Sequence, residues 1–153
     1  MTVFKYHLLI GCTMTVLNFR IHKMSGERRE KKVKSLEVKA NSTISSVKRE
    51  KDKRIGEYLL VNFKYDVDYT PGVGEIHLEG SLWYTHPKLD SVMTDLKDKI
   101  ELNKDAAREV SNAVIQESIV EALDLSRKIQ LPAPLQLPTV TVKSEKLRFA
   151  KAE

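Results

Sequence analysis

The chain has 153 residues, of which 41% are hydrophobic and 31% are charged, with 26 Lys/Arg against 21 Asp/Glu. The length and these proportions predict one folded domain with its own core. A membrane-spanning protein is excluded because no run in the sequence approaches the roughly 18 apolar residues that a span needs. The single cysteine, Cys12, excludes an intrachain disulfide and suits a reducing compartment.

Positive charge is concentrated in the N-terminal third of the chain. Residues 1–54 hold 14 Lys/Arg against 5 Asp/Glu, a net charge of +9, whereas residues 55–153 carry a net charge of −4. Such asymmetry is typical of contact with nucleic acid or a membrane surface, and equally of solvated loops. We favour solvated loops.

Residues 1–12 are interpreted as an N-terminal extension. The apolar run before Cys12 is too short for the hydrophobic region of about 7 to 15 residues in a secretion signal. Either Met1 or Met14 can be the start of the protein. We therefore expect a cytoplasmic protein with one domain over residues 13–142 and a charged tail over residues 143–153.

Two strands are predicted before the centre of the chain. Apolar and polar residues alternate in residues 13–22 and again in residues 35–47, and this period of two is typical of a half-buried strand. The charged stretches 23–34 and 48–54 are interpreted as the connections that follow these strands.

The central stretch, Ile55–Tyr84, predicts a long antiparallel hairpin. Alternate residues are apolar or aromatic in both arms, and Pro71-Gly72 between the arms supplies a turn. The hairpin thus has one apolar face, and the whole sheet is predicted to contain four antiparallel strands.

Two helices are predicted after the hairpin. Pro87 suits a first helical turn, and an amphipathic stripe at helical spacing follows it at Leu89, Val92, Met93, Leu96 and Ile100. Asn103 is a suitable N-cap for a second, long helix that ends near Lys128. The predicted fold class is therefore α+β, a four-stranded antiparallel sheet packed by one short and one long C-terminal helix.

The apolar residues of the long helix cover more than one of its faces. A single sheet cannot bury them all, so a second surface, another copy of the chain, is predicted to cover the rest. Residues 129–142 then combine three prolines with regularly spaced apolar residues, which indicates an extended segment lying against the fold.

No catalytic motif is present in the sequence. The Gly72-Val73-Gly74 stretch joins two strands and does not open a helix, as a phosphate-binding loop would. No nucleophile motif is recognisable, and the four histidines have no metal-ligand spacing. We expect no enzyme activity, no cofactor and no metal.

Four carboxylates flank the central turn on the face opposite the apolar one: Asp66, Asp68, Glu75 and Glu79. Exposed carboxylates are poor acid/base catalysts because nothing shifts their pKa. They form either a solvated face or an acidic docking patch for a basic partner.

Three large apolar side chains, Tyr58, Leu60 and Trp83, belong to the same outward face, near the end distant from the turn. Such residues either pack under the connecting segments or line a groove for extended or unfolded apolar segments. Both interpretations stay open.

A nucleic-acid-binding module is the first alternative function, with six cations as the predicted contacts: Lys31, Lys32, Lys34, Lys48, Arg49 and Arg54. The two basic loops that carry them flank one strand and so lie at its opposite ends, ~40 Å apart. Neither loop has aromatic residues for base stacking. Nucleic-acid binding is therefore disfavoured, and a structural oligomer without clients is the second alternative.

The order of elements resembles the SecB-like family of export chaperones: four long antiparallel strands, a short helix, a long helix and a Pro/Leu-rich exit. The local likeness is strongest at Ile129-Gln-Leu-Pro-Ala-Pro-Leu-Gln-Leu-Pro-Thr-Val140, which is similar to the family's Pro-x-Leu-x-Leu-x-Pro-Val stretch. Pro134, Leu135, Leu137, Pro138 and Val140 are in step with it, except that proline comes one residue early. The resemblance covers roughly residues 14–142.

This resemblance implies a cytoplasmic homotetramer, a dimer of dimers, that holds unfolded polypeptides without ATP. Clients would lie in grooves between the sheet and the helix linker, where Tyr58, Leu60, Trp83, Tyr84 and Leu89 are the expected contacts. The four outward carboxylates would meet an export motor. Typical members are strongly acidic whereas this chain is basic, which speaks against motor docking and leaves a toxin-antitoxin partner as the other expectation.

Overall fold

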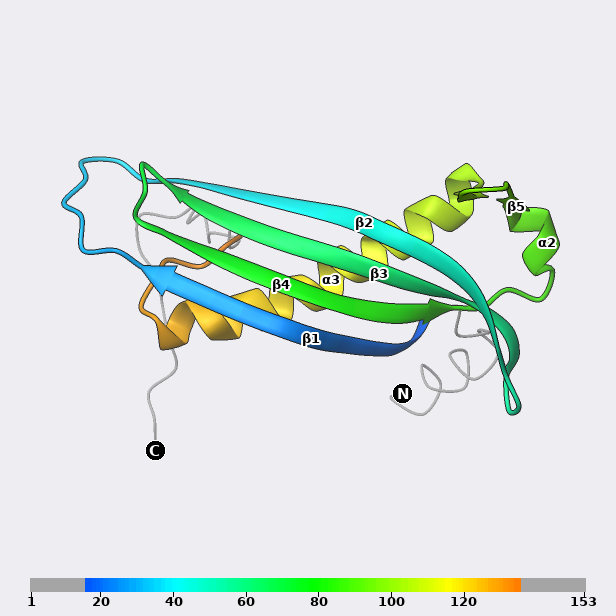
Figure 1. The fold of residues 1–153 in the computed structure, drawn as a ribbon. Coiled ribbons are helices and arrows are strands. Elements are labelled where there is room, and N and C mark those ends of the chain that lie inside the picture. Colours follow the sequence, from blue (N-terminus) through cyan, green and yellow to red (C-terminus); the bar gives the residue numbers. More distant parts are fainter. Residues whose placement is uncertain (1–15, 136–153) are drawn as a thin grey trace, which may run out of the picture.

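In the computed structural model, which describes residues 16–135, one four-stranded antiparallel sheet lies over one long helix (Figure 1). The strands are β1 (Val16–Arg28), β2 (Glu37–Asp52), β3 (Gly56–Thr70) and β4 (Gly74–Tyr84). They are followed by α2 (Leu89–Val92), β5 (Met93–Asp95), β6 (Ile100–Leu102) and α3 (Lys104–Lys128). The predicted α+β class, with four antiparallel strands and a long C-terminal helix, is confirmed.

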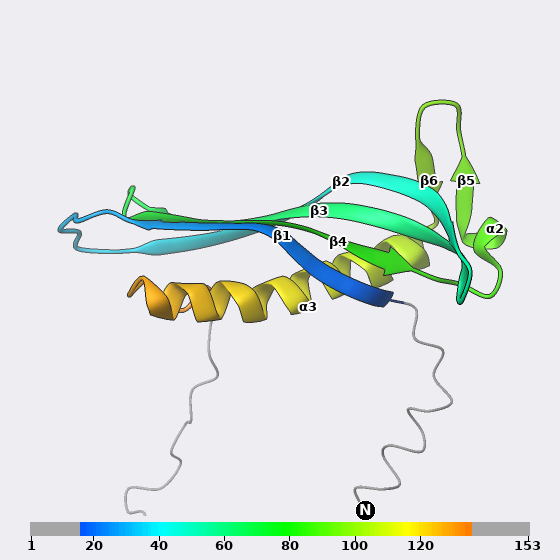
Figure 2. The same ribbon diagram turned by 60° about the horizontal axis from the view of Figure 1, so that its bottom comes forward.

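The strands lie in the order β1-β4-β3-β2, so the central hairpin β3–β4 forms the middle of the sheet. Alternate residues of β3 are buried from Leu59 to Tyr69. These residues pack with residues of α3. We call the side of the sheet that α3 covers the inner face and the opposite side the outer face (Figure 2). The period of two in the sequence therefore identified the buried face correctly.

Both edge strands are longer than predicted. β1 continues to Arg28 because Lys23–Arg28 pairs with Glu79–Gly74 of β4. β2 continues to Asp52, paired with the start of β3. The charged stretches at 23–28 and 48–52 were interpreted as loops because they lack apolar alternation, but an edge strand needs hydrogen bonds on one side only and can carry charge along its length.

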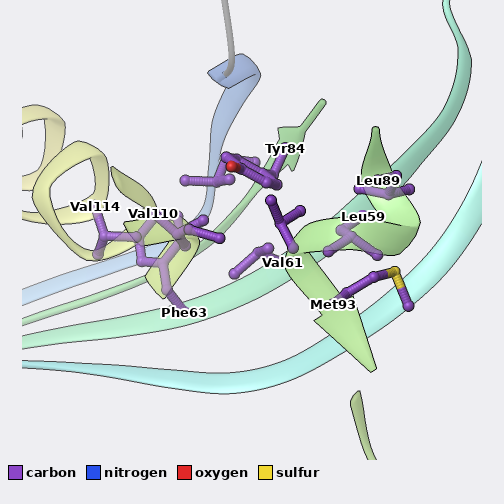
Figure 3. Packing of buried hydrophobic residues seen from close by; sticks show 11 residues of the cluster. Leu59, Val61, Phe63, Tyr84, Leu89, Met93, Val110 and Val114 are labelled. Carbon is purple, nitrogen blue, oxygen red and sulfur yellow. The ribbon is translucent and has the colours of Figure 1, made fainter. Parts of the chain in front are cut away.

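The core has two clusters on the inner face, one toward each end of the sheet. The first joins Leu59, Val61 and Phe63 of β3 to Val110 and Val114 of α3 (Figure 3). The second is centred on the other half of the hairpin, with Tyr65, Val67, Tyr69, Ile76, Leu78, Ala122 and Leu131. The long sheet and helix thus share a core that runs along their whole contact.

Gly80 on β4 leaves room for the rings of Phe19 on β1 and Phe63 on β3 to approach each other. A side chain at Gly80 would place its Cβ 2.2 Å from the carbonyl oxygen of Arg20 and 2.7 Å from Cζ of Phe63. Phe63 can therefore lie across β4 and stack on Phe19 of β1, with ring centroids 5.1 Å apart. The stacked rings connect β1 to β3 over a strand position that has no side chain of its own.

The segment between the sheet and α3 differs from its prediction. The helix begins at Leu89, two residues after the predicted start at Pro87, and ends at Val92. Residues 93–102 form the small β5–β6 hairpin instead of further helical turns. The backbone of Leu96 and Lys99 is hydrogen-bonded in both directions around Lys97-Asp98, and Asn103 N–H donates to the carbonyl of Val92 at 2.8 Å. Met93, Ile100 and Leu102 still pack in or against the first cluster. These apolar side chains are therefore brought to the core by a hairpin and not by a helix.

The long helix agrees closely with its prediction. The Asn103 side chain accepts a hydrogen bond from the N–H of Ala106 at 2.8 Å, and the helix ends at Lys128. Its buried residues recur every four positions: Ala106, Val110, Val114, Ser118, Ala122 and Ser126. Small side chains along this row let the helix lie close to the sheet.

Outside that row, α3 keeps apolar surface exposed. Val120 is 62% exposed and Ile115 is 38% exposed. The sheet of one chain therefore leaves part of this helix uncovered, as the sequence pattern predicted.

The chain leaves the helix alongside the β3–β4 turn. Leu131 is buried in the second core cluster, and the hydroxyl of Tyr69 donates to the carbonyl oxygen of Pro132 at 2.7 Å. The exit segment thus lies against the fold, as predicted, over its described part. The N-terminal extension 1–12, the last part of the predicted exit segment (136–142) and the tail 143–153 lie outside the described residues.

Candidate functional site

An apolar patch lies on the outer face at the end of the sheet where β4 finishes. The rings of Tyr58 and Trp83 stack with centroids 4.3 Å apart and an interplanar angle of 27°. Leu60 pairs directly with Trp83 across the β3–β4 ladder, and Leu17 of β1 pairs with Trp83 on its other side. The fold thus brings Tyr58, Leu60 and Trp83 together, as expected from strand alternation.

This patch is only partly covered. Leu60 and Trp83 are half-buried, whereas Tyr58 is 9% exposed. Stacked aromatic pairs contribute about 0.5–1.5 kcal/mol beyond the area they bury. The patch is therefore a partly exposed apolar surface on the side of the sheet away from α3.

The other two predicted contact residues lie elsewhere. Tyr84 is 1% exposed on the inner face, where its hydroxyl donates to Glu109 of α3 at 3.1 Å. Burial, helped by that hydrogen bond, raises the pKa of Tyr84 to about 12. Tyr84 therefore supports the core and is not accessible to a client in this chain, while Leu89 is mostly buried but lines a hollow.

That hollow opens at the same end of the sheet, between the β2–β3 turn and the start of the linker. It has a volume of about 610 Å³ and is lined by Ile55 and Glu57 on one side and by residues 86–91 on the other. Ile55 is 40% exposed. Its lining is mixed: Ile55, Pro87 and Leu89 are apolar, and the other lining residues are polar or charged, namely Glu57, His86, Lys88, Asp90 and Ser91.

A second, smaller hollow lies beside the first, between β2 and the β5–β6 hairpin. Its volume is about 300 Å³, and it is lined by Val47, Lys48, Arg49 and residues 95–100. Arg49 lies between the two hollows and donates to Asp90 at 2.9 Å and to Glu57 at 2.7 Å. This residue was predicted as a nucleic-acid contact, but its guanidinium instead connects β2, β3 and the α2 turn.

The four outward carboxylates do lie together on the outer face, toward the other end of the hairpin. Asp66, Asp68 and Glu75 line a hollow of about 450 Å³ together with His77. His77 contacts Asp66 through Nδ1 and lies 2.8 Å from Oε1 of Glu79 through Nε2. Both ring nitrogens donate to carboxylates only when the imidazole is doubly protonated.

The contacts of His77 with the two carboxylates change the pKa values of His77 and Glu79. The hydrogen bonds to Asp66 and then to Glu79 raise the pKa of His77, and the hydrogen bond from His77 lowers the pKa of Glu79. Lys64 lies 3.4 Å from Glu79, and Arg29 lies 3.2 Å from Glu75. The predicted acidic patch is thus largely neutralised by its own neighbours, a feature that the alternation of the strands could not reveal.

The six predicted nucleic-acid contacts are divided between the two ends of the sheet. Lys48, Arg49 and Arg54 lie at the linker end and are paired with acids: Glu50 at 2.8 Å from Lys48, Glu57 and Asp90 at Arg49, and Asp52 at 3.7 Å from Arg54. Lys31, Lys32 and Lys34 lie in the β1–β2 connection at the opposite end. The structure therefore does not join the six into one surface.

Within residues 16–135, no group of three or more His, Cys, Asp or Glu side chains is arranged to hold a metal ion. In the same part of the chain, no helix is long and apolar enough to cross a membrane. The surface features described above are the apolar patch, the three hollows and the charged surfaces.

The fold has a counterpart among solved structures. The SecB-like chaperone Rv1957 of Mycobacterium tuberculosis, in complex with a ChAD peptide from the Rv1956 HigA1 antitoxin, matches with a TM-score of 0.53 over 84% of this chain and 91% of that chain, at 16% sequence identity. No family model and no curated protein matches the sequence. At this identity the likeness concerns the fold alone: the chain shares the α+β architecture of that protein.

Proposed function

We propose that the protein is an ATP-independent holdase chaperone that binds extended or unfolded segments of other polypeptides. One observation carries the proposal: on a fold shared with a peptide-binding SecB-like chaperone, apolar side chains remain exposed where the sheet meets its linker.

The apolar patch and the larger hollow together supply a surface for an extended client. Trp83 and Leu60 on the outer face offer contact area, and the hollow beside Ile55 and Leu89 accepts a side chain of the client. Both lie at the linker end of the sheet, where β4 ends and residues 85–103 begin (Figure 1). An extended segment can engage apolar pockets with alternate side chains, which gives affinity without requiring a fixed client sequence.

Assembly is part of the proposed mechanism. Each chain offers a small apolar surface, so a single contact with a client is weak. Several copies would hold one long client through several sites, and avidity would then supply strength while each site exchanges rapidly. A homotetramer built as a dimer of dimers is the assembly that the family resemblance implies, and the exposed apolar residues of α3 are consistent with a contact between copies.

The clients proposed first are segments of an antitoxin type, because the matching chaperone holds a peptide from an antitoxin. Docking to an export motor is proposed second. The carboxylates Asp66, Glu75 and Glu79 are already paired with His77, Arg29 and Lys64, so a basic partner would have to displace these contacts. A cytoplasmic location remains part of the proposal.

The test is an aggregation assay with a reduced, unfolded client, in which Trp83→Asp is compared with the wild type. The charge placed in the apolar patch should abolish most of the protection, because it replaces apolar contact area with a solvated carboxylate. Thr43→Asp is the matched control, since Thr43 is exposed on β2, in the half of the sheet away from Trp83. It should protect as well as the wild type.

Two results would remove the proposal. Lack of protection by the wild type would favour a structural oligomer without clients. Equal protection by wild type and the Trp83 variant would mean that the patch is not the client surface. Client holding through apolar contacts should also depend weakly on salt, whereas the nucleic-acid alternative predicts a steep loss of binding as salt rises.

A further inference from the structure

Cations from separate parts of the chain meet at the end of the molecule opposite the linker. β1 ends at Arg28, and the β1–β2 connection that follows carries Lys31, Lys32 and Lys34 (Figure 1). This connection lies beside the β3–β4 turn, since Arg29 N–H donates to the carbonyl of Val73 at 2.7 Å. The sequence places these residues in one loop but does not show what lies next to them.

The C-terminus of α3 joins the same end. Arg28 donates to the side chain of Gln130 at 3.0 Å, and a Cβ on Gly26 would lie 2.9 Å from Ile129. These contacts bring Arg127 and Lys128 to the β1–β2 connection although about 100 residues separate them along the chain. We call residues 26–34 and 124–130 the basic end.

Most of the cations of the basic end form no ion pair within residues 16–135. Arg29 is paired with Glu27 and Glu75, and Lys128 is paired with Asp124. Across residues 16–135, no carboxylate forms an ion pair with the remaining cations, which are Arg28, Lys31, Lys32, Lys34 and Arg127. All five are exposed.

The chain outside the described residues adds charge of the same sign. The described part ends at residue 135, just after Pro132 is held by the hydroxyl of Tyr69 next to the β3–β4 turn. Residues 136–153 contain four Lys/Arg against two Asp/Glu. The continuation therefore starts close to the basic end and carries net positive charge.

We infer that the basic end binds the phosphate backbone of double-stranded nucleic acid through charge alone. Lys and Arg side chains on exposed loops and helix ends contact phosphates without reading sequence. No aromatic side chain of residues 26–34 or 124–130 is present for stacking on unpaired bases, which favours a duplex over a single strand. A membrane surface is disfavoured, because residues 26–34 contain no Trp, Phe or Leu side chain of the kind that anchors an interfacial segment.

This inference does not depend on client holding. β4 runs from the basic end at Gly74 to the linker end at Tyr84, a distance of about 33 Å at the rise of an extended strand. A duplex at one end would therefore leave the apolar patch at the other end free. The protein could hold a client while attached to nucleic acid.

The test measures binding of the full chain to a short DNA duplex of mixed sequence over a range of salt concentrations. About five phosphate contacts predict a log–log slope of about −4.5, and so a loss of several hundredfold between about 50 and 200 mM salt. The triple variant Lys31→Gln/Lys32→Gln/Lys34→Gln should reduce the slope by about 3 and weaken binding at least about tenfold near 0.1 M salt. Arg127→Gln alone should reduce the slope by about 1.

The matched control removes three exposed cations from the opposite end of the sheet, Lys51→Gln/Lys53→Gln/Arg54→Gln. It makes the same change in net charge and should leave the slope and affinity nearly unchanged.

Equal weakening by both triple variants would overturn the inference, as would no duplex binding by the wild type. Binding to vesicles of phosphatidylglycerol and phosphatidylcholine in preference to the duplex would also overturn it. Protection of an unfolded client by the triple variant should equal that of the wild type, which separates this surface from the proposed client surface.

Discussion

His77 is the residue whose ionisation the fold controls most directly. Its ring is held between Asp66 on β3 and Glu79 on β4, with Lys64 and Lys23 near Glu79 from the neighbouring strand positions. The two carboxylates favour the charged ring and raise the pKa of His77 above the ordinary value of 6.5. The folded state thus binds the imidazolium proton more tightly than the unfolded state does.

The direction of this shift predicts how stability depends on pH. The contribution of His77 is fully present below pH 6.5 and is lost as pH rises through its higher pKa in the folded state. The contribution of Glu79, whose pKa is lowered from 4.5, is present above pH 4.5 and is lost as pH falls through its folded value. We expect both contributions to be present between pH 4.5 and 6.5, and urea midpoints should therefore fall from the upper part of this window toward alkaline pH.

The variant His77→Gln should flatten that alkaline fall, because the glutamine side chain carries no titrating proton. His86→Gln is the control, since His86 lies in the linker, where its Nδ1 accepts from the N–H of Lys88. It should keep the pH dependence of the wild type. An equally steep fall in the His77 variant would show that another group is responsible.

At the scale of single residues, the sequence predicted which side of a strand a residue occupies but not what covers that side. Alternation placed Tyr58, Leu60 and Trp83 on one face, and the structure agrees. Tyr84 was added to the contact residues through the family resemblance, although it alternates with Trp83 and lies in the core. The ion pairs around Arg49 and His77 join residues from different strands and from α2, and no pattern within one strand predicts them.

Among the elements, α3 contains one buried group without a partner. Ser118 is fully buried in the row that faces the sheet, and its Oγ has no hydrogen bond. Ser126, two positions further along the same row, is equally buried, but its hydroxyl donates to the carbonyl oxygen of Leu123 at 2.7 Å. The same residue type thus occurs in two environments that differ in one hydrogen bond.

This pair gives a matched prediction. Ser118→Ala removes a buried, unsatisfied hydroxyl and should raise the free energy of unfolding by about 1 kcal/mol. Ser126→Ala gains the same helix propensity but loses a hydrogen bond, so it should be neutral or destabilising by up to about 1 kcal/mol. Urea unfolding of the three proteins measures the difference. Equal effects of both substitutions would mean that the hydroxyl of Ser118 finds a partner in solution.

The elements also show where periodicity fails as a predictor. The long helix was predicted within one residue at each end because its N-cap and its terminal cations are local signals. The β5–β6 hairpin was mistaken for helix because five apolar residues fitted a helical stripe. In a segment this short, packing against the end of the sheet decides the conformation, and that contact is not encoded in the spacing of the segment itself.

At the scale of the whole molecule, the sequence indicated apolar surface left over after folding but not its position. The buried row of α3 accounts for six residues, and Ile115 and Val120 lie outside it with 38% and 62% of their surface exposed. The basic end was likewise missed, because Arg127 and Lys128 join the β1–β2 connection only through the packing of α3 under the sheet. Both surfaces depend on which elements become neighbours.

The exposed residues of α3 lead to a prediction about assembly. If copies of the chain cover each other's helices, the double variant Ile115→Lys/Val120→Lys should place unpaired charge in the contact and shift the protein to a smaller assembly, because burying such a charge is unfavourable. Light scattering after size-exclusion chromatography measures the mass. The control variant Asn112→Lys/Gln116→Lys changes two exposed polar residues of the same helix by the same charge and should keep the wild-type mass. A wild-type protein that is already monomeric, or a double variant with unchanged mass, would show that these two side chains are ordinary exposed residues. Avidity could not then contribute through this helix, and client holding would depend on the apolar patch of a single chain.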